Sequence, residues 1–270
     1  MRFKPGLTAK VTKHIISNKI RNNKRFSLVL MLEPKFMCNL SCEGCGRIRE
    51  YKRDLHKMMS VAECLKAAGE CGAPIVSICG GEPLVYPYLG ELIEKLTRKG
   101  KYIYLCTNGL LFKDKMEKLK PGGNLMINFH VDGLEKTHDT ITGARGTYAR
   151  VLEAIKAAKK KNFFVCTNTT IYKQTDINEL KQLFKALHGA GVDGFLISPA
   201  YGYTHMGESF FFRRKELADF FKRLEPEFKK YNFLGSPLYL EFVQGKRELD
   251  CAPWSTPTRN PIGWRSPCYQ

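Results

Sequence analysis

Three cysteines within eight residues constrain this chain more than any other feature. Cys38, Cys42 and Cys45 have the spacing C-x3-C-x2-C and follow an apolar run, residues 28–32, that predicts a buried strand. Three thiolates on one loop can bind a soft metal centre, but they leave the fourth position of a tetrahedral zinc site or a four-iron cluster unfilled. The spacing also differs from the paired C-x2-C units of zinc ribbons. It favours a cluster whose open iron binds a substrate over a zinc loop completed by a distant Cys or His.

The composition indicates one globular α/β domain in a reducing compartment. A chain of 270 residues with 43% hydrophobic residues is long enough for a substantial core. It is too long and too rich in core residues for a disulfide scaffold, although it contains ten cysteines. We expect no signal peptide and no membrane span, because no apolar run approaches the roughly 18 residues that a span needs. The expected location is cytoplasmic.

The net charge of +18 favours an anionic partner, although a solvated lysine-rich surface is the simpler explanation. We expect no nucleic acid, because no binding motif is present and aromatic residues are not interleaved with the basic runs. Residues 1–26 are basic, and Val11, Ile15, Ile16 and Ile20 fall near helical spacing. The segment predicts a helix that either lies on an anionic membrane surface, at the inner membrane face, or closes the bottom of the domain.

A regular alternation of strands and helices follows the cysteines. It predicts parallel strands with right-handed crossovers. Six such units form an open, partial TIM-type (β/α)6 barrel, whose active residues lie at the C-terminal ends of the strands. Residues 27–230 form this core, and 231–270 form a C-terminal extension. The expected strands are 28–32, 75–79, 102–106, 125–131, 163–169 and 194–198, and the expected helices are 60–71, 88–99, 113–119, 147–161, 176–190 and 213–230, with a loop over 47–59.

Polar motifs stand at the ends of these strands. Gly80, Gly81 and Glu82 follow the second strand, and the glycines allow a backbone to approach closely. Asn108 and Asn168 end the third and fifth strands, where Asn either binds ribose hydroxyls or forms a turn. The fourth strand ends in the pair His130 and Asp132, followed by the dipeptide 138–139. His130 is either a catalytic group or a histidine satisfied within the fold.

The cysteine triplet together with Gly-Gly-Glu resembles the radical S-adenosylmethionine (radical SAM; AdoMet) superfamily. The resemblance implies a 4Fe–4S cluster on Cys38, Cys42 and Cys45, with AdoMet bound to the open iron. It also implies that the Gly-Gly-Glu segment receives the AdoMet amino group. The superfamily usually has an aromatic residue before the third cysteine, where this chain has Gly44. We expect Phe36 or Ile48 to replace that aromatic side chain.

Two further positions depart from the superfamily pattern. His130 stands where a serine is usual, and Thr142 stands near the expected arginine. Arg145 is the expected replacement, as a partner for the AdoMet carboxylate.

A closer resemblance is to the hopanoid-biosynthesis branch of this superfamily, the adenosylhopane synthases. That branch also has glycine before the third cysteine. The resemblance implies addition of a 5′-deoxyadenosyl radical to the alkene of a hopene (diploptene), and a sequence that continues beyond Tyr269. The runs that carry it are 28–34, 38–46, 70–74, 104–108, 191–194 and 257–260.

This resemblance also implies partners and a hydrogen donor. The partners are the hydrophobic triterpene and an electron donor such as a flavodoxin or ferredoxin. Cys106 is the expected donor of a hydrogen atom, the alternative being an inert buried thiol. Aromatic residues of the C-terminal third fit such a substrate, although they also fit a core: Tyr201, Tyr203, Phe210, Phe211, Phe212, Phe242, Trp254 and Trp264.

Two other functions stay open from the sequence. One is a radical SAM enzyme that abstracts hydrogen from a peptide, which the His138–Asp139 dipeptide favours. The other is a non-enzymatic zinc protein that binds nucleic acid through its basic surface.

Overall fold

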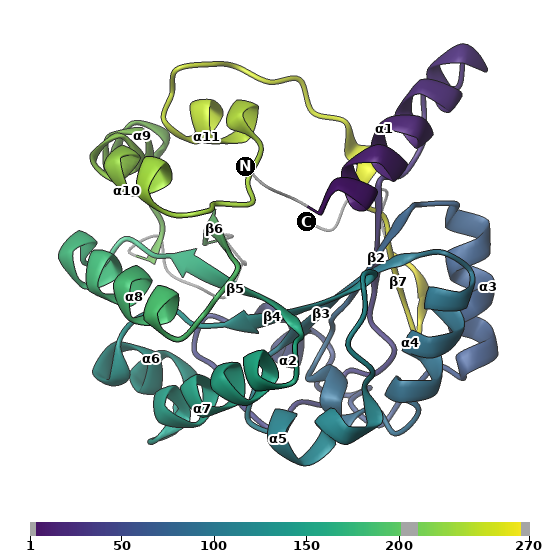
Figure 1. Ribbon diagram of the computed structural model, residues 1–270, viewed down its shortest axis with the longest axis horizontal. Helices are drawn as coiled ribbons and strands as arrows, with labels where there is room; N and C mark the ends of the chain where they lie inside the picture. Colours follow the sequence, from purple (N-terminus) through teal and green to yellow (C-terminus); the bar gives the residue numbers. More distant parts are fainter. Residues whose placement is uncertain (1–3, 201–209, 266–270) are drawn as a thin grey trace.

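A curved, mainly parallel sheet forms the centre of the molecule. The computed structural model describes residues 4–200 and 210–265. In this part of the chain the sheet has the order β6-β5-β4-β3-β2-β1-β7-β8, and only the β7–β8 pair is antiparallel. Helices cover its convex side, and α1 and α11 lie on its concave side (Figure 1). The strands are β1 (Val29–Leu32), β2 (Ile75–Ile78), β3 (Tyr102–Thr107), β4 (Leu125–His130), β5 (Phe164–Ile171), β6 (Gly194–Pro199), β7 (Thr258–Asn260) and β8 (Gly263–Trp264).

The two faces of the sheet bury different side chains. Along β3, Ile103, Leu105 and Thr107 are buried beneath the helices, whereas the alternate residues Tyr104 and Cys106 face the concave side. The apolar core therefore lies between sheet and helices. The covering helices include α3 (Val61–Cys71), α4 (Leu89–Arg98), α5 (Phe112–Lys115), α6 (Glu135–Thr142), α7 (Thr147–Lys160) and α8 (Ile177–Gly189). The remaining helices are α2 (Gly46–Glu50), α9 (Arg214–Arg223), α10 (Glu225–Lys230) and α11 (Pro237–Val243), and Phe220 and Phe221 of α9 belong to the same core.

The predicted open (β/α)6 barrel is confirmed, and several local signals are confirmed with it. Ser60 and Glu63 form a capping box at the start of α3. Gly100 follows α4 with φ 71°, a conformation that glycine adopts without strain. Asp176 caps α8 by accepting hydrogen bonds from two backbone N–H groups.

Several elements differ from the prediction. Helices α6 and α11 form where none was expected, so His138 and Asp139, expected in a loop, lie on a helix. The sheet has two further strands, because β7 pairs in parallel with β1 and β8 pairs back on β7. The expected loop over 47–59 begins inside a short helix, α2. The expected helix 213–230 is two helices, which meet at Leu224 because Pro226 lacks an N–H group and stands in the first turn of α10.

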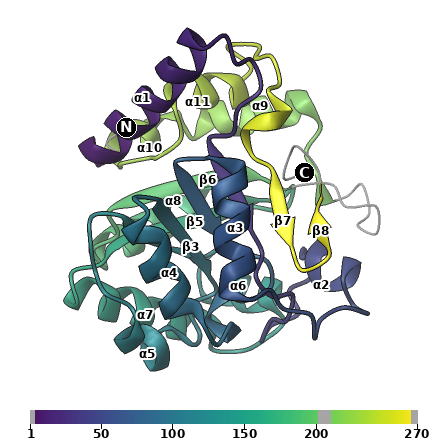
Figure 2. The same ribbon diagram turned by 90° about the vertical axis from the view of Figure 1, so that its right-hand side faces the viewer.

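Helix α1 (Pro5–Ile20) closes the N-terminal end of the concave face. Leu7 is buried against Ile75 and Met126, and Val11 packs beside it. Figure 2 shows α1 and α2 at opposite ends of the sheet. The other side of α1 is open, since 52% of Ile16 and 79% of Ile20 is exposed. The helix therefore fills the barrel and also presents an apolar surface to solvent.

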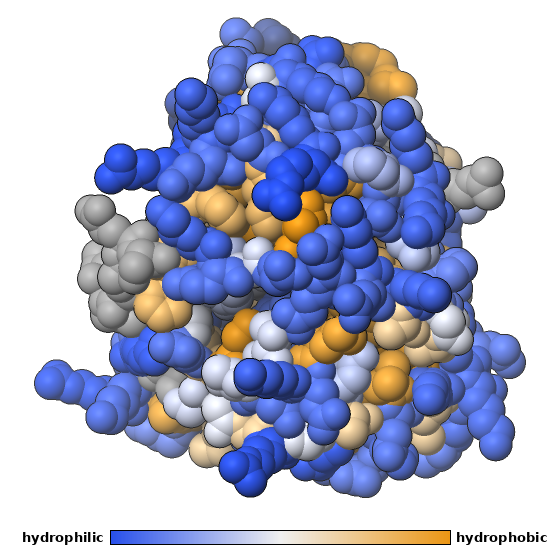
Figure 3. Space-filling view, turned by 90° about the vertical axis from the view of Figure 1, so that its left-hand side faces the viewer, coloured by the Kyte–Doolittle hydropathy of each residue, from blue (hydrophilic) through white to orange (hydrophobic). Residues whose placement is uncertain are grey.

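One face of the molecule is predominantly hydrophilic. The face drawn in Figure 3 carries mostly polar side chains, with apolar side chains in small separate areas. No helix in residues 4–200 or 210–265 is long and apolar enough to cross a membrane.

Candidate active site

The cysteine loop leaves β1 and is held against the segment that leaves β2. Gly81 N–H donates to the Lys35 carbonyl at 3.2 Å, and Glu82 N–H donates to the Met37 carbonyl at 3.0 Å. The two chain exits therefore run side by side at the C-terminal edge of the sheet. This pairing fixes the backbone immediately before Cys38.

Two glycines make this approach possible. A Cβ atom on Gly81 would lie 2.2 Å from the Met37 carbonyl oxygen and 2.3 Å from that of Phe36. Gly80 has φ 109°, and its Cβ would lie 2.9 Å from the Lys35 carbonyl oxygen. Because the obstructing atoms are backbone atoms, a side chain at either position forces the two segments apart.

The three cysteine thiols lie close to one another on this loop. Leu40 N–H donates to Cys38 Sγ at 3.4 Å, and Cys45 N–H donates to the Cys42 carbonyl at 3.2 Å. Burial, with a smaller contribution from the neighbouring thiolates, raises the pKa of Cys38 to about 11 and that of Cys42 to about 12. A cationic centre that binds all three sulfurs would stabilise the thiolates, lower these pKa values and release the thiol protons.

The chemistry of this donor set, three thiolates on one loop, fits a 4Fe–4S cluster with one open iron. In a 4Fe–4S cluster each cysteine binds a different iron, so the three sulfurs do not share a centre. The N–H group on Cys38 Sγ is of the kind that stabilises the charge of ligating sulfurs.

Glu82 is buried, and its carboxylate is occupied by donors from its own chain. It accepts from Thr107 Oγ1 at 2.7 Å, from Leu84 N–H at 2.9 Å and from Asn108 N–H at 2.8 Å. Burial raises its pKa to about 6, although these hydrogen bonds oppose the shift. The carboxylate thus joins the end of β2 to the end of β3.

Asn108 connects the end of β3 with the cysteine loop. Its Nδ2 donates to Asn39 Oδ1 at 2.8 Å and lies 3.9 Å from Cys38 Sγ. Its Oδ1 accepts from Leu110 N–H at 3.0 Å, so Asn108 also forms the turn that the sequence allowed as the alternative. Asn168 lies on β5 opposite His130 of β4 in the parallel register.

The end of β4 carries a histidine–carboxylate pair. His130 Nε2 and Asp132 Oδ2 are 2.6 Å apart, and the second Asp132 oxygen accepts from Thr170 N–H at 2.8 Å. Burial lowers the pKa of His130, but the charge and hydrogen bond of Asp132 outweigh it, and the net shift is upward. About 36% of the His130 side chain is exposed, so this ring faces the open end of the barrel.

The His138–Asp139 dipeptide has a structural role in this fold. It lies on α6, where His138 is buried and its Nδ1 accepts from Asp132 N–H at 3.2 Å. The Asp139 carboxylate binds the start of α7 by accepting from Tyr148 N–H at 2.9 Å and Thr147 Oγ1 at 2.7 Å. Thr142 is buried, and Thr147 lies 2.8 Å from its hydroxyl.

The other predicted residues lie in different surroundings. Arg145 is exposed in the turn between α6 and α7. Cys106 lies on the concave face of β3, with Sγ 3.5 Å from Ser77 Oγ and 3.6 Å from Asn128 Nδ2. Phe36 is buried and stacks on Tyr51 with ring centres 4.0 Å apart, so its ring is engaged beneath the loop. The side chain of Ile48 is outside the described residues.

A buried ion pair supports the cysteine loop. The sequence did not predict it. Glu33, at the end of β1, is fully buried and lies 3.1 Å from Arg47 Nε, two residues after Cys45. Asn260 of β7 donates to the other Glu33 oxygen at 3.3 Å. Burial raises the pKa of Glu33, and the Arg47 charge opposes that shift. Strand β7 thereby supports the cysteine loop.

The described aromatic residues of the C-terminal third have different surroundings. Phe212 packs on Phe220, with ring centres 5.2 Å apart, and Phe242 lies under Arg214. Trp254 and Trp264 are exposed by 42% and 43%. Tyr201 and Tyr203 lie outside the described residues.

Comparison with known families decides the class of this site. The sequence profile of the Radical SAM superfamily matches residues 32–198. The chain belongs to this superfamily. Radical SAM enzymes use a 4Fe–4S cluster with AdoMet and need an external electron donor, which excludes the non-enzymatic zinc alternative. A second profile, for a domain of unknown function (DUF3463), matches residues 195–270.

Curated and solved members of the superfamily resemble the chain over different lengths. AdoMet-dependent heme synthase of Methanosarcina barkeri is 29% identical over 168 residues, covering 60% of this chain and 48% of that protein. GTP 3′,8-cyclase of Aquifex aeolicus is 30% identical over 172 residues, covering 61% and 54%. The chain thus spans about half the length of these relatives.

A solved radical SAM structure has the same fold over almost the whole chain. Streptococcus suis SuiB bound to S-adenosylmethionine superposes with a TM-score of 0.75 and 19% identity, covering 96% of this chain and 64% of that one.

Gly81→Ala should destabilise the protein, because its Cβ meets two carbonyl oxygens. We expect a loss toward the upper end of about 1–3 kcal/mol in the free energy of unfolding, measured by urea titration of the cluster-free protein. Gly69→Ala is the control, since it lies inside α3 with nothing within 4 Å and should stabilise by about 0.5–1 kcal/mol. Equal effects of the two substitutions would contradict the proposed backbone contact.

His138 should make stability depend on pH. Burial lowers its pKa to about 4, whereas an unfolded histidine titrates near about 6.5. Between these values the unfolded chain binds a proton that the folded chain does not, so stability falls as the pH falls through this window. His138→Gln should lose less stability than the wild type between about pH 6.5 and 4. Identical slopes for the wild type and His138→Gln would refute the assignment.

Proposed function

We propose that this radical SAM enzyme adds a 5′-deoxyadenosyl radical to the alkene of a hopene and releases adenosylhopane. The motif runs shared with the adenosylhopane synthases, which include the glycine before the third cysteine, support this substrate. The observation that carries the proposal is the Cys106 thiol on the concave face of β3, two residues before Asn108. An enzyme that only abstracts hydrogen has no need of a second hydrogen donor there.

The cofactors supply the adenosyl radical, and the chain supplies the steps that follow. Addition to the alkene forms a carbon–carbon bond and leaves an unpaired electron on the substrate carbon. Transfer of a hydrogen atom from Cys106 saturates the substrate carbon radical and leaves a radical on the Cys106 sulfur. One electron from the external donor and one proton restore the thiol. The overall reaction thus uses two electrons and one proton, and a flavodoxin or ferredoxin is the proposed donor.

The surroundings of Cys106 suit hydrogen-atom transfer. Burial raises its pKa, and hydrogen bonds with Ser77 and Asn128 oppose the shift only in part. The side chain therefore keeps its S–H bond at neutral pH. A thiolate at this position would be a nucleophile and could not donate hydrogen.

The proposed AdoMet site comprises the residues at the strand ends. Cys38, Cys42 and Cys45 would hold the cluster. Because the Glu82 carboxylate is engaged by three donors, the backbone of the Gly80–Glu82 turn is the better candidate for the AdoMet amino group. Asn108 and Asn168 are the proposed contacts of the ribose, and Arg145 is the proposed contact of the AdoMet carboxylate. His130 and Asp132 are also proposed to bind the cofactor.

The competing proposal is hydrogen abstraction from a peptide. SuiB has also been solved bound to its precursor peptide SuiA, with a TM-score of 0.76 and 19% identity to this chain. The His138–Asp139 dipeptide no longer favours this alternative, because His138 accepts from the Asp132 backbone after β4 and Asp139 binds the start of α7. Anaerobic incubation with AdoMet, reductant and diploptene separates the two proposals. An adenosyl adduct detected by mass spectrometry supports addition, and 5′-deoxyadenosine without an adduct opposes it.

Cys106 variants test the hydrogen donor. Cys106→Ser keeps a hydroxyl for Ser77 and Asn128, but its O–H bond is too strong to give up a hydrogen atom. We expect Cys106→Ser and Cys106→Ala to cleave AdoMet while releasing at least tenfold less saturated adduct. Cys166→Ala is the control, because Cys166 is a buried thiol on the neighbouring part of the sheet. If Cys106→Ser gives the wild-type yield of saturated adduct, Cys106 is not the hydrogen donor. Reduction of the substrate radical by electron transfer, followed by protonation from solvent, would then be favoured.

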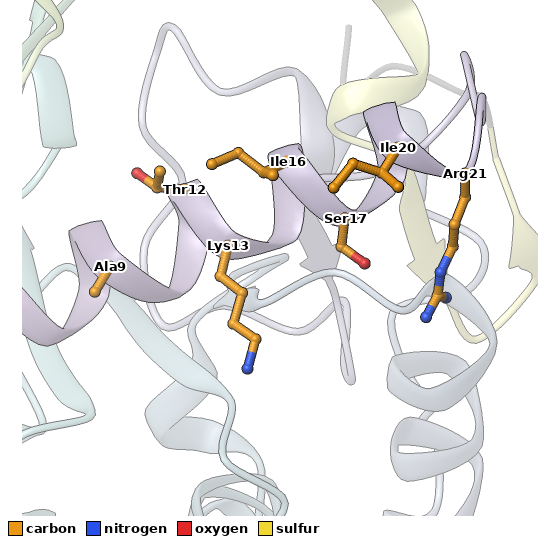
Figure 4. Close-up of a pocket in the computed structure, with 7 residues that line it drawn as sticks. All are labelled: Ala9, Thr12, Lys13, Ile16, Ser17, Ile20 and Arg21. Atoms are coloured by element: carbon orange, nitrogen blue, oxygen red, sulfur yellow. The ribbon is translucent and has the colours of Figure 1, made fainter.

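We further propose that α1 brings the enzyme to an anionic membrane surface, where a hopene resides. An open groove of about 570 Å³ runs along its outer side, lined by Ile16 and Ile20 with Lys13 and Arg21 beside them (Figure 4). Apolar side chains flanked by basic ones suit the interface of an anionic bilayer, where each basic residue contributes about 1 kcal/mol.

Replacing both Ile16 and Ile20 by Ser should weaken binding to phosphatidylglycerol vesicles, measured by sedimentation. These substitutions are preferable to deleting residues 1–22, because Leu7 is part of the core. Leu238→Ser is the control, an exposed leucine on α11. Binding that is unchanged in the double variant, or insensitive to salt, would argue that α1 only closes the barrel.

A further inference from the structure

Gly44 precedes the third cysteine, and its space is filled by an aromatic ring from another strand. A Cβ atom on Gly44 would lie 2.4 Å from Tyr172 Oη and 3.0 Å from Tyr172 Cζ. The backbone of Gly44 is outside the left-handed region, so the lack of a side chain here is a matter of space and not of φ. Tyr172 thus occupies the position that a side chain at residue 44 would need.

Tyr172 is well placed to form part of the cofactor site. It directly follows β5, at the edge of the sheet where the cysteines and the His130–Asp132 pair lie. Its backbone is fixed by two hydrogen bonds with Thr175, one from Tyr172 N–H to Oγ1 at 2.9 Å and one from Thr175 N–H at 3.0 Å. Burial raises the pKa of its hydroxyl, and the charges of Asp132 and Cys42 act in the same direction.

We propose that Tyr172 is the aromatic wall of the cofactor site, covering the cluster between Cys42 and Cys45 and stacking on the adenine of AdoMet. The ring reaches the site from β5, whereas most superfamily members carry theirs on the cysteine loop. Adenine is the part of AdoMet that offers a π face, and stacking on an aromatic ring is a favourable way to hold a base. The inference rests on the superfamily cofactors and is independent of the hopene proposal.

The stacking surface would have two effects that do not involve turnover. It would hold the adenine, and it would keep water and oxygen from one side of the cluster. Tyr172→Phe keeps the ring and should behave like the wild type in both respects. Tyr172→Leu fills a similar apolar volume without a π face, so it separates stacking from simple packing.

The test compares AdoMet binding and cluster lability in anaerobically reconstituted protein. Tyr172→Leu and Tyr172→Ala should raise the Kd of AdoMet roughly tenfold, equivalent to about 1.4 kcal/mol, measured by equilibrium dialysis. Tyr172→Ala should also lose the absorbance of the cluster faster in air. If both variants keep the wild-type Kd and only the unfolding temperature changes, Tyr172 is a packing residue and the proposal is wrong.

A position swap makes the test sharper. Gly44→Tyr alone should lower both stability and AdoMet affinity, because its side chain collides with Tyr172. The double variant Gly44→Tyr with Tyr172→Ala returns a ring to the cysteine loop and should recover most of the affinity lost by either change. Losses that simply add in the double variant would overturn the exchange of positions. Iron content of each protein, measured first, separates loss of the cluster from loss of AdoMet binding.

Discussion

The close approach of two backbones, one leaving β1 and the other leaving β2, is the constraint on which the site depends. Gly81 has no room for a Cβ atom because the carbonyl oxygens of Phe36 and Met37 lie in its place. This contact fixes the chain just before Cys38, so the loop geometry is set before any cluster binds. A preorganised ligand loop lowers the conformational cost of metal binding, and here its rigidity comes from the sheet edge.

Two buried carboxylates extend this rigidity to both sides of the loop. Glu82 joins β2 to β3 through Thr107 and Asn108, while Glu33 joins β1 to Arg47. Each charge is compensated by partners from a neighbouring segment. Glu33 and Arg47 form an ion pair, and removing one partner of a buried ion pair commonly costs about 3–5 kcal/mol, because the other charge is left alone. The partners of Glu82 are neutral hydrogen-bond donors. The loop is therefore held by charges that become unfavourable if the strand ends separate.

The barrel could be predicted because its signals are local. The period of apolar residues and the glycines that end helices can both be recognised within short segments of the sequence. Strand β7 could not be found in this way, since three residues have no measurable period and their partner, β1, is more than 200 residues earlier. Tyr172 was equally hidden, because its relation to Gly44 exists only once β5 and the cysteine loop meet. The break at Leu224 is a different case. Pro226 indicated a helix boundary, but the continuous apolar period favoured a single helix.

The position of Cys106 addresses a conflict that any radical addition must resolve. A weak S–H bond close to the adenosyl radical would quench it before the alkene reacts. Cys106 shares the concave face of the sheet with His130, but its register partner on β4 is Asn128, two residues earlier. A strand rises about 3.3 Å per residue, so the thiol lies about 7 Å deeper in the barrel than the rim where AdoMet is proposed to bind. An alkene held between rim and thiol would receive the adenosyl carbon from above and the hydrogen atom from below. In the proposed reaction, the depth of Cys106 would protect the adenosyl radical and still allow hydrogen transfer to the substrate radical.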